Sequence, residues 1–168
     1  MNDRPILRMP DRRLRSVAAP VGEVTDEIRA LADEMLRVMY AAPGRGLAGP
    51  QIGEMRRIFV MDCGWKEGAP DPCVMIDPEI VWASPETASC SEGCLSLPGI
   101  TVAVTRPAAV TLRFTGLDGA RHEDAFTGFA AVCVQHERDH LDGILCIDRL
   151  DAQTRAAMAD VLRRIEGP

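Results

Sequence analysis

The segment around which this chain is organised is residues 135–140, which read QHERDH. On an α-helix, His136 and His140 are four positions apart and therefore lie one turn apart on the same face. Both imidazoles can then reach one metal ion, and Glu137 is placed to act as a general base toward water. The spacing predicts a helix that carries a catalytic metal site.

The residues on either side favour a helix over the same stretch. Phe129, Val132 and Cys133 stand at positions i, i+3 and i+4, and the two histidines continue the series at i+7 and i+11. Gly143 follows, where a glycine often ends a helix. The metal motif is therefore expected on a helix that ends near Gly143.

Other hydrophobic patterns predict the remaining elements. One helix is expected from Thr25 to about Tyr40, and a last helix from about Ala152. Between them, short apolar or alternating runs predict strands, with Asp118 and Gly119 forming a hairpin turn. The expected strands are 58–61, 74–76, 80–82, 100–104, 110–114 and 121–126. This order predicts an α+β fold with mostly antiparallel sheets, in a single domain over residues 1–168.

The composition excludes several classes of protein. With 19 basic and 25 acidic residues the net charge is −6, so no direct nucleic-acid binding is expected. No apolar run approaches the roughly 20 residues of a membrane span. The six cysteines follow an N-terminal segment without the apolar core of a secretion signal, which favours reduced thiols in the cytoplasm.

A catalytic metal needs a third protein ligand and an open position, and the sequence offers several candidates. No histidine follows His140, while His122 precedes it on the expected hairpin. Cys94 is the better candidate, because the segment EGCLSLP at 92–98 could present its thiolate at a strand edge. The downstream carboxylates that remain as alternatives are Asp142, Asp148, Asp151, Asp160 and Glu166.

A glycine-rich loop, GRGLAGPQ at residues 44–51, precedes the strands. It lacks the Gly-Lys-Ser/Thr ending of a phosphate-binding loop. Its glycines would let the backbone approach a ligand, and Gln51 offers an amide donor. A simple loop that ends a helix is an equally compatible interpretation.

In this order, the three segments at 44–51, 92–96 and 135–140 resemble the motifs of the peptide deformylase family, and the similarity covers most of the chain. The resemblance implies antiparallel sheets packed around a central helix with the HExxH motif, flanked by an N-terminal and a C-terminal helix. It also implies a hydrolase of protein biosynthesis that removes the N-formyl group from the first methionine of new polypeptides. The implied partners are N-formyl-methionyl nascent peptides, with the ribosome exit region as a candidate.

The resemblance assigns roles to the residues that match the motifs. Cys94, His136 and His140 would hold one divalent metal, with Fe2+ expected in the cell and Zn2+, Ni2+ or Co2+ in purified samples. Glu137 would be the general base. The Gln51 side-chain amide and the Leu95 backbone N–H would stabilise the oxyanion.

Further residues match positions that bind the substrate. Gly46 and Gly93 would pair with the peptide backbone. A pocket for the methionine side chain would be lined by Phe129, Val132 and Cys133, although these are equally compatible with a helix core.

Four positions depart from the family pattern. Arg45, also at the substrate site, replaces an aliphatic residue, and its head must either reach solvent or meet an acidic group. Gly49 replaces an alanine and is expected to loosen packing under the loop. Thr101 stands where an arginine often contacts the substrate, and Cys146 where an aromatic residue is common.

Two other functions remain open at this stage. One is a non-catalytic or specialised deformylase-like peptide-binding protein, against which the retained Glu137 and metal ligands count. The other is a metal-dependent peptidase or amidase. The absence of a histidine, or of a convincing glutamate ligand, after His140 counts against that alternative.

Overall fold

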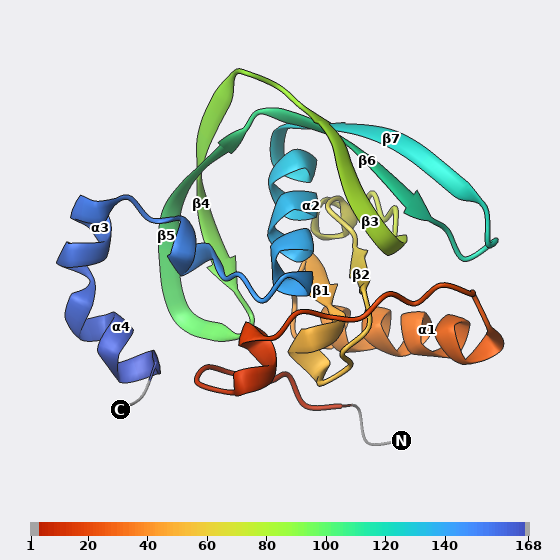
Figure 1. Ribbon diagram of the computed structural model, residues 1–168, viewed down its shortest axis with the longest axis horizontal. Helices are drawn as coiled ribbons and strands as arrows, with labels where there is room; N and C mark the ends of the chain where they lie inside the picture. The colour runs from red at the N-terminus through yellow and green to blue at the C-terminus, as the bar shows by residue number, and fades with distance from the viewer. Residues whose placement is uncertain (1–3, 167–168) are drawn as a thin grey trace.

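A computed structural model describes residues 4–166 (Figure 1). Four α-helices, seven strands and four short 3-10 helices (η) make up these residues. In chain order they are η1 Arg12–Arg15, α1 Asp26–Ala41, β1 Gly46–Ala48, η2 Gly49–Ile52, β2 Ile58–Met61, η3 Trp65–Glu67, β3 Cys73–Ala83, β4 Thr87–Cys94, β5 Leu97–Pro107, β6 Ala109–Thr115, β7 Arg121–Thr127, α2 Gly128–Leu141, η4 Cys146–Arg149, α3 Ala152–Ala157 and α4 Ala159–Glu166.

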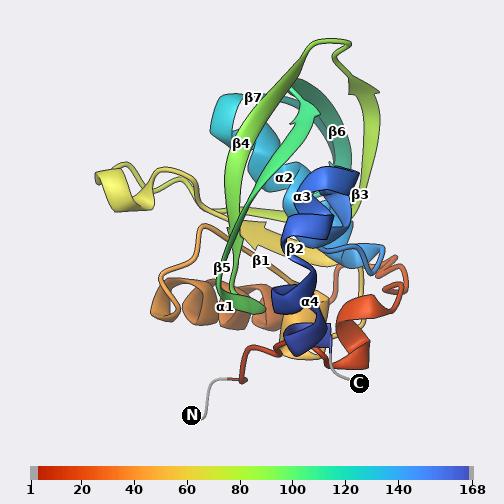
Figure 2. The same ribbon diagram turned by 90° about the vertical axis from the view of Figure 1, so that its left-hand side faces the viewer.

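The strands form two antiparallel sheets on either side of α2. One sheet has five strands in the order β1-β2-β3-β6-β7, and the other is the long two-stranded ribbon β4-β5. In Figure 1, α2 runs through the middle of the molecule, and Figure 2 shows the ribbon in front of it. The predicted α+β fold, with antiparallel sheets around a central helix, is therefore confirmed.

Helix α2 is buried along most of its length because it has apolar neighbours on the sheet side. Ala131, Val134 and Leu141 pack in one cluster with Phe59 of β2 and Leu112 of β6. This packing removes apolar surface from water, which is the main force that holds the helix in place. The opposite face of α2 is thereby turned toward β4, and this is the face that carries the two histidines.

Helix α1 begins where the sequence predicts. The Thr25 hydroxyl accepts a hydrogen bond from the Ile28 N–H, which satisfies one free donor at the helix N-terminus. Its apolar stripe, including Leu31 and Met35, packs against Ile58 of β2. Helix α1 therefore closes one side of the five-stranded sheet, below α2 in Figure 1.

The structure differs from the expected order of elements in three ways. The segments 74–76 and 80–82 are one strand, β3, which is irregular near Asp77, where φ is +48°. Strand β4 was missed because most of its residues are exposed and polar and lack an alternating apolar pattern. The last helix is split at Met158 into α3 and α4, and Met158 and Leu162 both pack in the cluster around β5 and η4.

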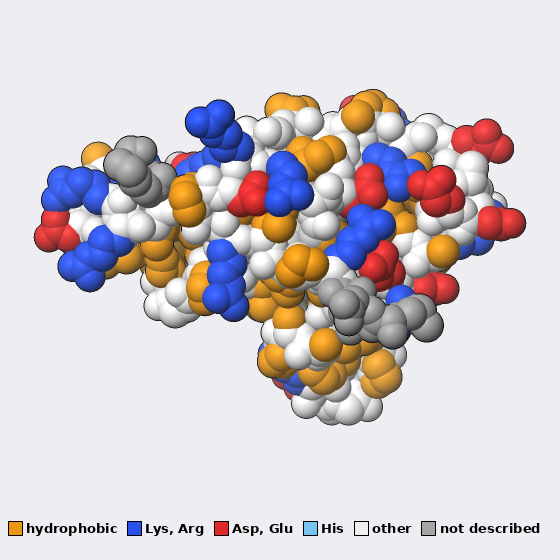
Figure 3. Space-filling view, turned by 90° about the horizontal axis from the view of Figure 1, so that it is seen from below, with side chains coloured by type: hydrophobic (Ala, Val, Ile, Leu, Met, Phe, Trp, Pro, Cys, Tyr) orange, Lys and Arg blue, Asp and Glu red, His pale blue; other side chains and the backbone are white. Residues whose placement is uncertain are grey.

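The surface seen from below mixes basic and acidic side chains, and the acidic ones are most numerous toward the end of the molecule where α1 lies (Figure 3). No helix within residues 4–166 has the length and apolar character that crossing a membrane requires.

Candidate active site

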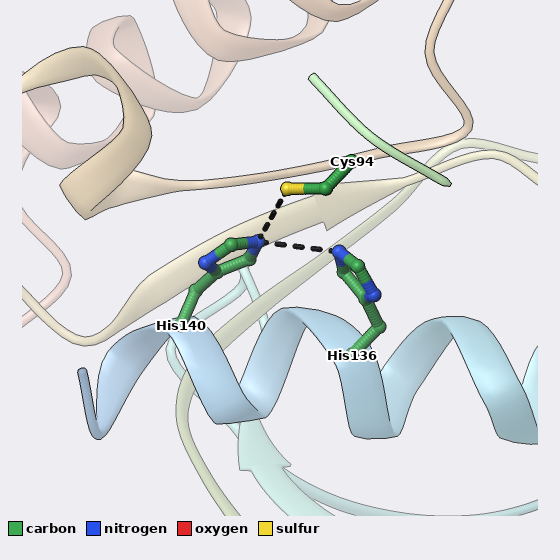
Figure 4. Close-up of side chains that lie close together, drawn as sticks. All are labelled: Cys94, His136 and His140. Atoms are coloured by element: carbon green, nitrogen blue, oxygen red, sulfur yellow. Dashed lines mark hydrogen bonds between the residues drawn. The ribbon is translucent and has the colours of Figure 1, made fainter. Parts of the chain in front are cut away.

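Three side chains from two elements meet beside α2. Cys94 ends β4, while His136 and His140 project from successive turns of α2 (Figure 4). Nε2 of His140 lies 3.4 Å from the Cys94 sulfur and 3.2 Å from Nε2 of His136. One sulfur and two ring nitrogens thus converge on a single point.

The spacing of these atoms fits a bound metal ion. A tetrahedral ion with bonds of about 2.3 Å to sulfur and about 2.0 Å to nitrogen would separate such ligand atoms by about 3.3–3.6 Å. The observed 3.2 and 3.4 Å are close to that range. His122, the upstream alternative, instead lies 3.1 Å from Asp118 on the β6–β7 hairpin.

A carboxylate fixes the orientation of His136. Nδ1 of His136 lies 2.9 Å from Oε2 of Glu92, so the ring donates its Nδ1 proton there and leaves the lone pair of Nε2 free. Burial alone would raise the pKa of Glu92, but hydrogen bonds from His136 and Arg106 lower it below its usual range. Glu92 therefore stays ionised and keeps the histidine in the metal-binding tautomer.

The carboxylate belongs to a buried charge network that the sequence analysis missed. Arg106 of β5 makes two hydrogen bonds to Glu92, at 2.6 and 3.0 Å, and a third to Asp139 at 2.8 Å. Asp139 also accepts from Arg149 at 2.6 Å. In the sequence, Glu92 was marked only as part of the cysteine motif. Arg106 reaches it from β5, the strand that pairs with β4.

Glu137 lies beside the cluster of metal-binding candidates Cys94, His136 and His140, and it is buried. Its Oε2 atom is enclosed without a hydrogen-bond partner among the described residues. Burial raises the pKa of this carboxyl to about 7, which is the range a general base needs near neutral pH. The side chain is therefore poised to exchange a proton with a molecule in the adjoining cavity.

The amide of Gln51 is held in one orientation. Its Oε1 accepts a hydrogen bond from the Ala48 N–H at 2.9 Å. Nε2 therefore points the other way, 3.1 Å from the Ser96 hydroxyl and 3.6 Å from the Cys94 sulfur. The Gln51 amide thus directs its N–H donor toward the Cys94 sulfur.

A cavity of about 690 Å³ opens beside these groups. Apart from His140, which lies behind the others, every residue assigned to the site in the sequence analysis lines it. These are Arg45, Gly46, Gln51, Gly93, Cys94, Leu95, Phe129, Val132, Cys133, His136 and Glu137. Thr101 also lines the cavity, opposite Gly93 in the β4–β5 ribbon.

Arg45 meets an acidic group of its own chain. Its guanidinium makes hydrogen bonds of 2.7 and 2.5 Å to the Glu67 carboxylate and a further one to the Cys63 carbonyl. It also lies 5.5 Å from the ring centre of Phe129. Arg45 is thus fixed over one wall of the cavity, with its charge balanced by Glu67.

The structure overturns the expectation for Gly49. A Cβ atom at this position would lie 2.7 Å from the Glu54 carbonyl oxygen and 2.9 Å from that of Arg56. Both contacts are with backbone atoms, which cannot move aside cheaply. Gly49 therefore allows tight packing under the loop and does not loosen it.

Comparisons with known proteins agree with this geometry. The family model described as polypeptide deformylase matches residues 3–156. A peptide deformylase of Rhodopseudomonas palustris strain BisB5 is 50% identical over 165 residues, which cover 97% of this chain and 93% of the relative.

Solved structures are similar over nearly the whole chain. A plant peptide deformylase is 31% identical with a TM-score of 0.93, covering 99% of this chain and 90% of the other. The peptide deformylase of Synechococcus elongatus, crystallised in complex with actinonin, is 35% identical with a TM-score of 0.86, and the match covers 93% of this chain and 86% of the other. The chain belongs to the polypeptide deformylase family.

Proposed function

We propose that this chain is a metal-dependent peptide deformylase that hydrolyses the N-formyl group of N-formyl-methionyl nascent peptides and releases formate. The observation that carries this proposal is that the donor atoms of Cys94, His136 and His140 meet beside one cavity, together with a Glu137 carboxylate oxygen that has no hydrogen-bond partner in the described part of the chain. Family membership and the resemblance of all three motifs support the same reaction.

Cys94, His136 and His140 would hold the metal ion. One thiolate and two neutral imidazoles leave a divalent ion with a net positive charge, and such an ion supplies Lewis-acid activation of water and of the formyl oxygen. We propose Fe2+ as the cellular metal. Zinc is expected to compete for the same ligands, because it binds nitrogen and sulfur donors at least as tightly as Fe2+.

Glu137 would move the proton. Its carboxylate accepts a proton from the water that attacks the formyl carbon, and then delivers that proton to the amine nitrogen as the C–N bond breaks. A pKa of about 7 suits both transfers, because the group can hold and release a proton near neutral pH.

Two donors would stabilise the negative charge that develops on the formyl oxygen. Nε2 of Gln51 is directed at the cluster, and the Leu95 N–H follows Cys94 directly in the chain. Donors held in place before the reaction are effective because they need not reorganise as charge develops. The backbones at Gly46 and Gly93 would pair with the peptide main chain.

The methionine side chain would lie against Phe129, Val132 and Cys133, one or two turns before His136 on α2. Arg45 covers Phe129 and would bound this pocket on the outer side. We further propose that the enzyme works in the cytoplasm, where newly made peptides leave the ribosome exit region.

The direct test is formate release from formyl-Met-Ala-Ser. Anaerobically prepared protein loaded with Fe2+ is expected to release one formate per peptide. The variant Glu137→Gln should bind the metal normally but lose about 10²–10⁴-fold in kcat, because an amide cannot accept the proton. Absence of formate from fully metal-loaded wild type, or activity of Glu137→Gln within a few-fold of wild type, would contradict the proposal or the assigned base.

A further inference from the structure

The charged residues that line the cavity are distributed unevenly between its floor and its rim. The two acidic ones, Glu92 and Glu137, are buried on the floor. The three basic ones are Arg8, Arg45 and Lys66, and Arg45 is neutralised by Glu67. Two cations, Arg8 and Lys66, therefore remain exposed at the rim.

Neither rim cation forms a direct ion pair with an acid among the described residues. Arg8 makes no side-chain ion pair there, whereas Arg4 and Arg13 in the same N-terminal segment pair with Glu54 and Asp11. Lys66 lies 5.5 Å from the ring centre of Trp65; its charge acts on the neighbouring Glu67 carboxylate, but within residues 4–166 it makes no direct ion pair. The exposed acid beside Lys66 in the chain is Glu67, and its carboxylate is bound to Arg45. Because the whole chain carries a net charge of −6, a rim on which the cations outnumber the acids among the described residues is a local reversal of sign.

Arg8 is held at this position by the site itself. The Leu7 N–H donates to the Gln51 carbonyl at 2.7 Å, and the Met9 N–H donates to the Ser96 carbonyl at 3.2 Å. The backbone on both sides of Arg8 is thus anchored to two segments of the active site. The backbone of Arg8 is consequently fixed at the rim, and its exposed side chain extends from there into solvent.

We propose that Arg8 and Lys66 form a cationic rim that selects peptides with an acidic side chain among the residues just after the formyl-methionine. This inference rests on the proposed function. A peptide whose first residue lies on the floor must cross the rim as it leaves the cavity, and there a carboxylate meets unpaired cations. The attraction acts on binding before the reaction, so it is expected to lower KM and leave kcat nearly unchanged.

The test uses C-terminally amidated peptides, so that an acidic side chain supplies the only carboxylate. For wild type we expect kcat/KM for formyl-Met-Asp-Ser amide to exceed that for its Asn counterpart by about two- to fivefold per contact, as for other exposed ion pairs. The excess should shrink when salt is raised to about 1 M, because the screening length falls to about 3 Å. Moving the Asp to the next position identifies which residue meets the rim.

The double variant Arg8→Gln with Lys66→Gln is expected to bring the Asp/Asn ratio to about one, and each single variant to lower it in part. The ratio does not depend on how much of the protein is active, so imperfect folding does not obscure it. Arg12→Gln is the matched control, since Arg12 is an exposed arginine of the same segment that does not line the cavity. It should leave the ratio unchanged.

The proposed selection by the rim would be wrong if the Asp/Asn ratio of kcat/KM were near one in wild type, or if the double variant left it unchanged, while the neutral peptide still released formate. Failure to release formate even from the neutral peptide would instead remove the proposed function and this inference with it.

Discussion

Gly46 at the start of β1 and Glu137 on α2 approach so closely that a Cβ atom on Gly46 would lie 2.3 Å from Oε1 of Glu137. The carboxylate of the proposed base fills the space that any side chain at position 46 would need. Glu137 can therefore occupy its observed position only if residue 46 is a glycine. This requirement is separate from any hydrogen bond that the Gly46 backbone makes with a peptide.

Gly46→Ala is accordingly expected to displace Glu137 and to lower kcat for formyl-Met-Ala-Ser by at least about 10²-fold, the scale of a lost general base. Metal affinity should change little. The comparison variant is Gly93→Ala, at the other glycine proposed to pair with the peptide; there a Cβ atom meets nothing nearer than the Ile100 carbonyl at 3.9 Å, so KM can change but Glu137 is not displaced and kcat should stay within a few-fold of wild type. Both variants should unfold near the wild-type temperature. An unchanged kcat in Gly46→Ala would contradict the prediction, because it would mean that Glu137 can move aside and still act.

The second prediction separates two possible ligand groups that share His136. One contains Cys94 and His140, and the other contains Glu92 and Cys146. Glu92 is already bound by Arg106, and burial raises the pKa of the Cys146 thiol to about 12, which opposes the thiolate that a metal needs.

Cys94→Ala should therefore weaken metal binding by more than about 100-fold, beyond the 10–100-fold typical for loss of a supporting residue. Cys146→Ala should leave the affinity within a few-fold of wild type. Competition of each variant with a chromogenic chelator measures this. The reverse order of affinities would move the metal to the second group.

The third prediction concerns the buried ion pairs of Arg106. Its side chain is 5% exposed, and Arg106→Met would leave Glu92 and Asp139 enclosed without their common partner. Breaking a buried pair in this way costs about 3–5 kcal/mol of unfolding free energy.

The control is Arg113→Met, which removes the exposed pair with Glu123 and should cost only about 0–1 kcal/mol. Urea unfolding of the metal-free proteins compares the two. Equal losses would mean that the Arg106 network contributes no more than a surface pair.

The fourth prediction follows from Tyr40, the single tyrosine of the chain. Burial, together with a 2.7 Å hydrogen bond to Asp62, raises its pKa to about 12. Since the unfolded chain loses this proton near pH 10, the folded state holds it longer, and stability should fall as pH rises from about 10 through 12.

Ultraviolet absorbance of tyrosinate gives the pKa directly, because no other tyrosine contributes. Asp62→Asn should lower this pKa part of the way toward its usual value, leaving the share that is due to burial. Titration of the folded wild-type protein near pH 10 would contradict the assigned environment.

Local spacing was sufficient to predict the features whose interactions are close in sequence. His136 and His140 are four positions apart, so any α-helix places them on one face, and Thr25 caps α1 through an N–H only three positions away. The resemblance of three short motifs then predicted the family and the residues proposed for the site.

Tertiary packing was needed for every relationship between distant segments. The Cys94 sulfur reaches His140 because β4 lies against α2, and Arg106 reaches Glu92 because β4 pairs with β5. The acid that balances Arg45 is Glu67 of η3, a segment that no motif marks. Spacing along one helix sets which of its side chains share a face, whereas contacts between elements depend on how the apolar surfaces of all of them are buried together.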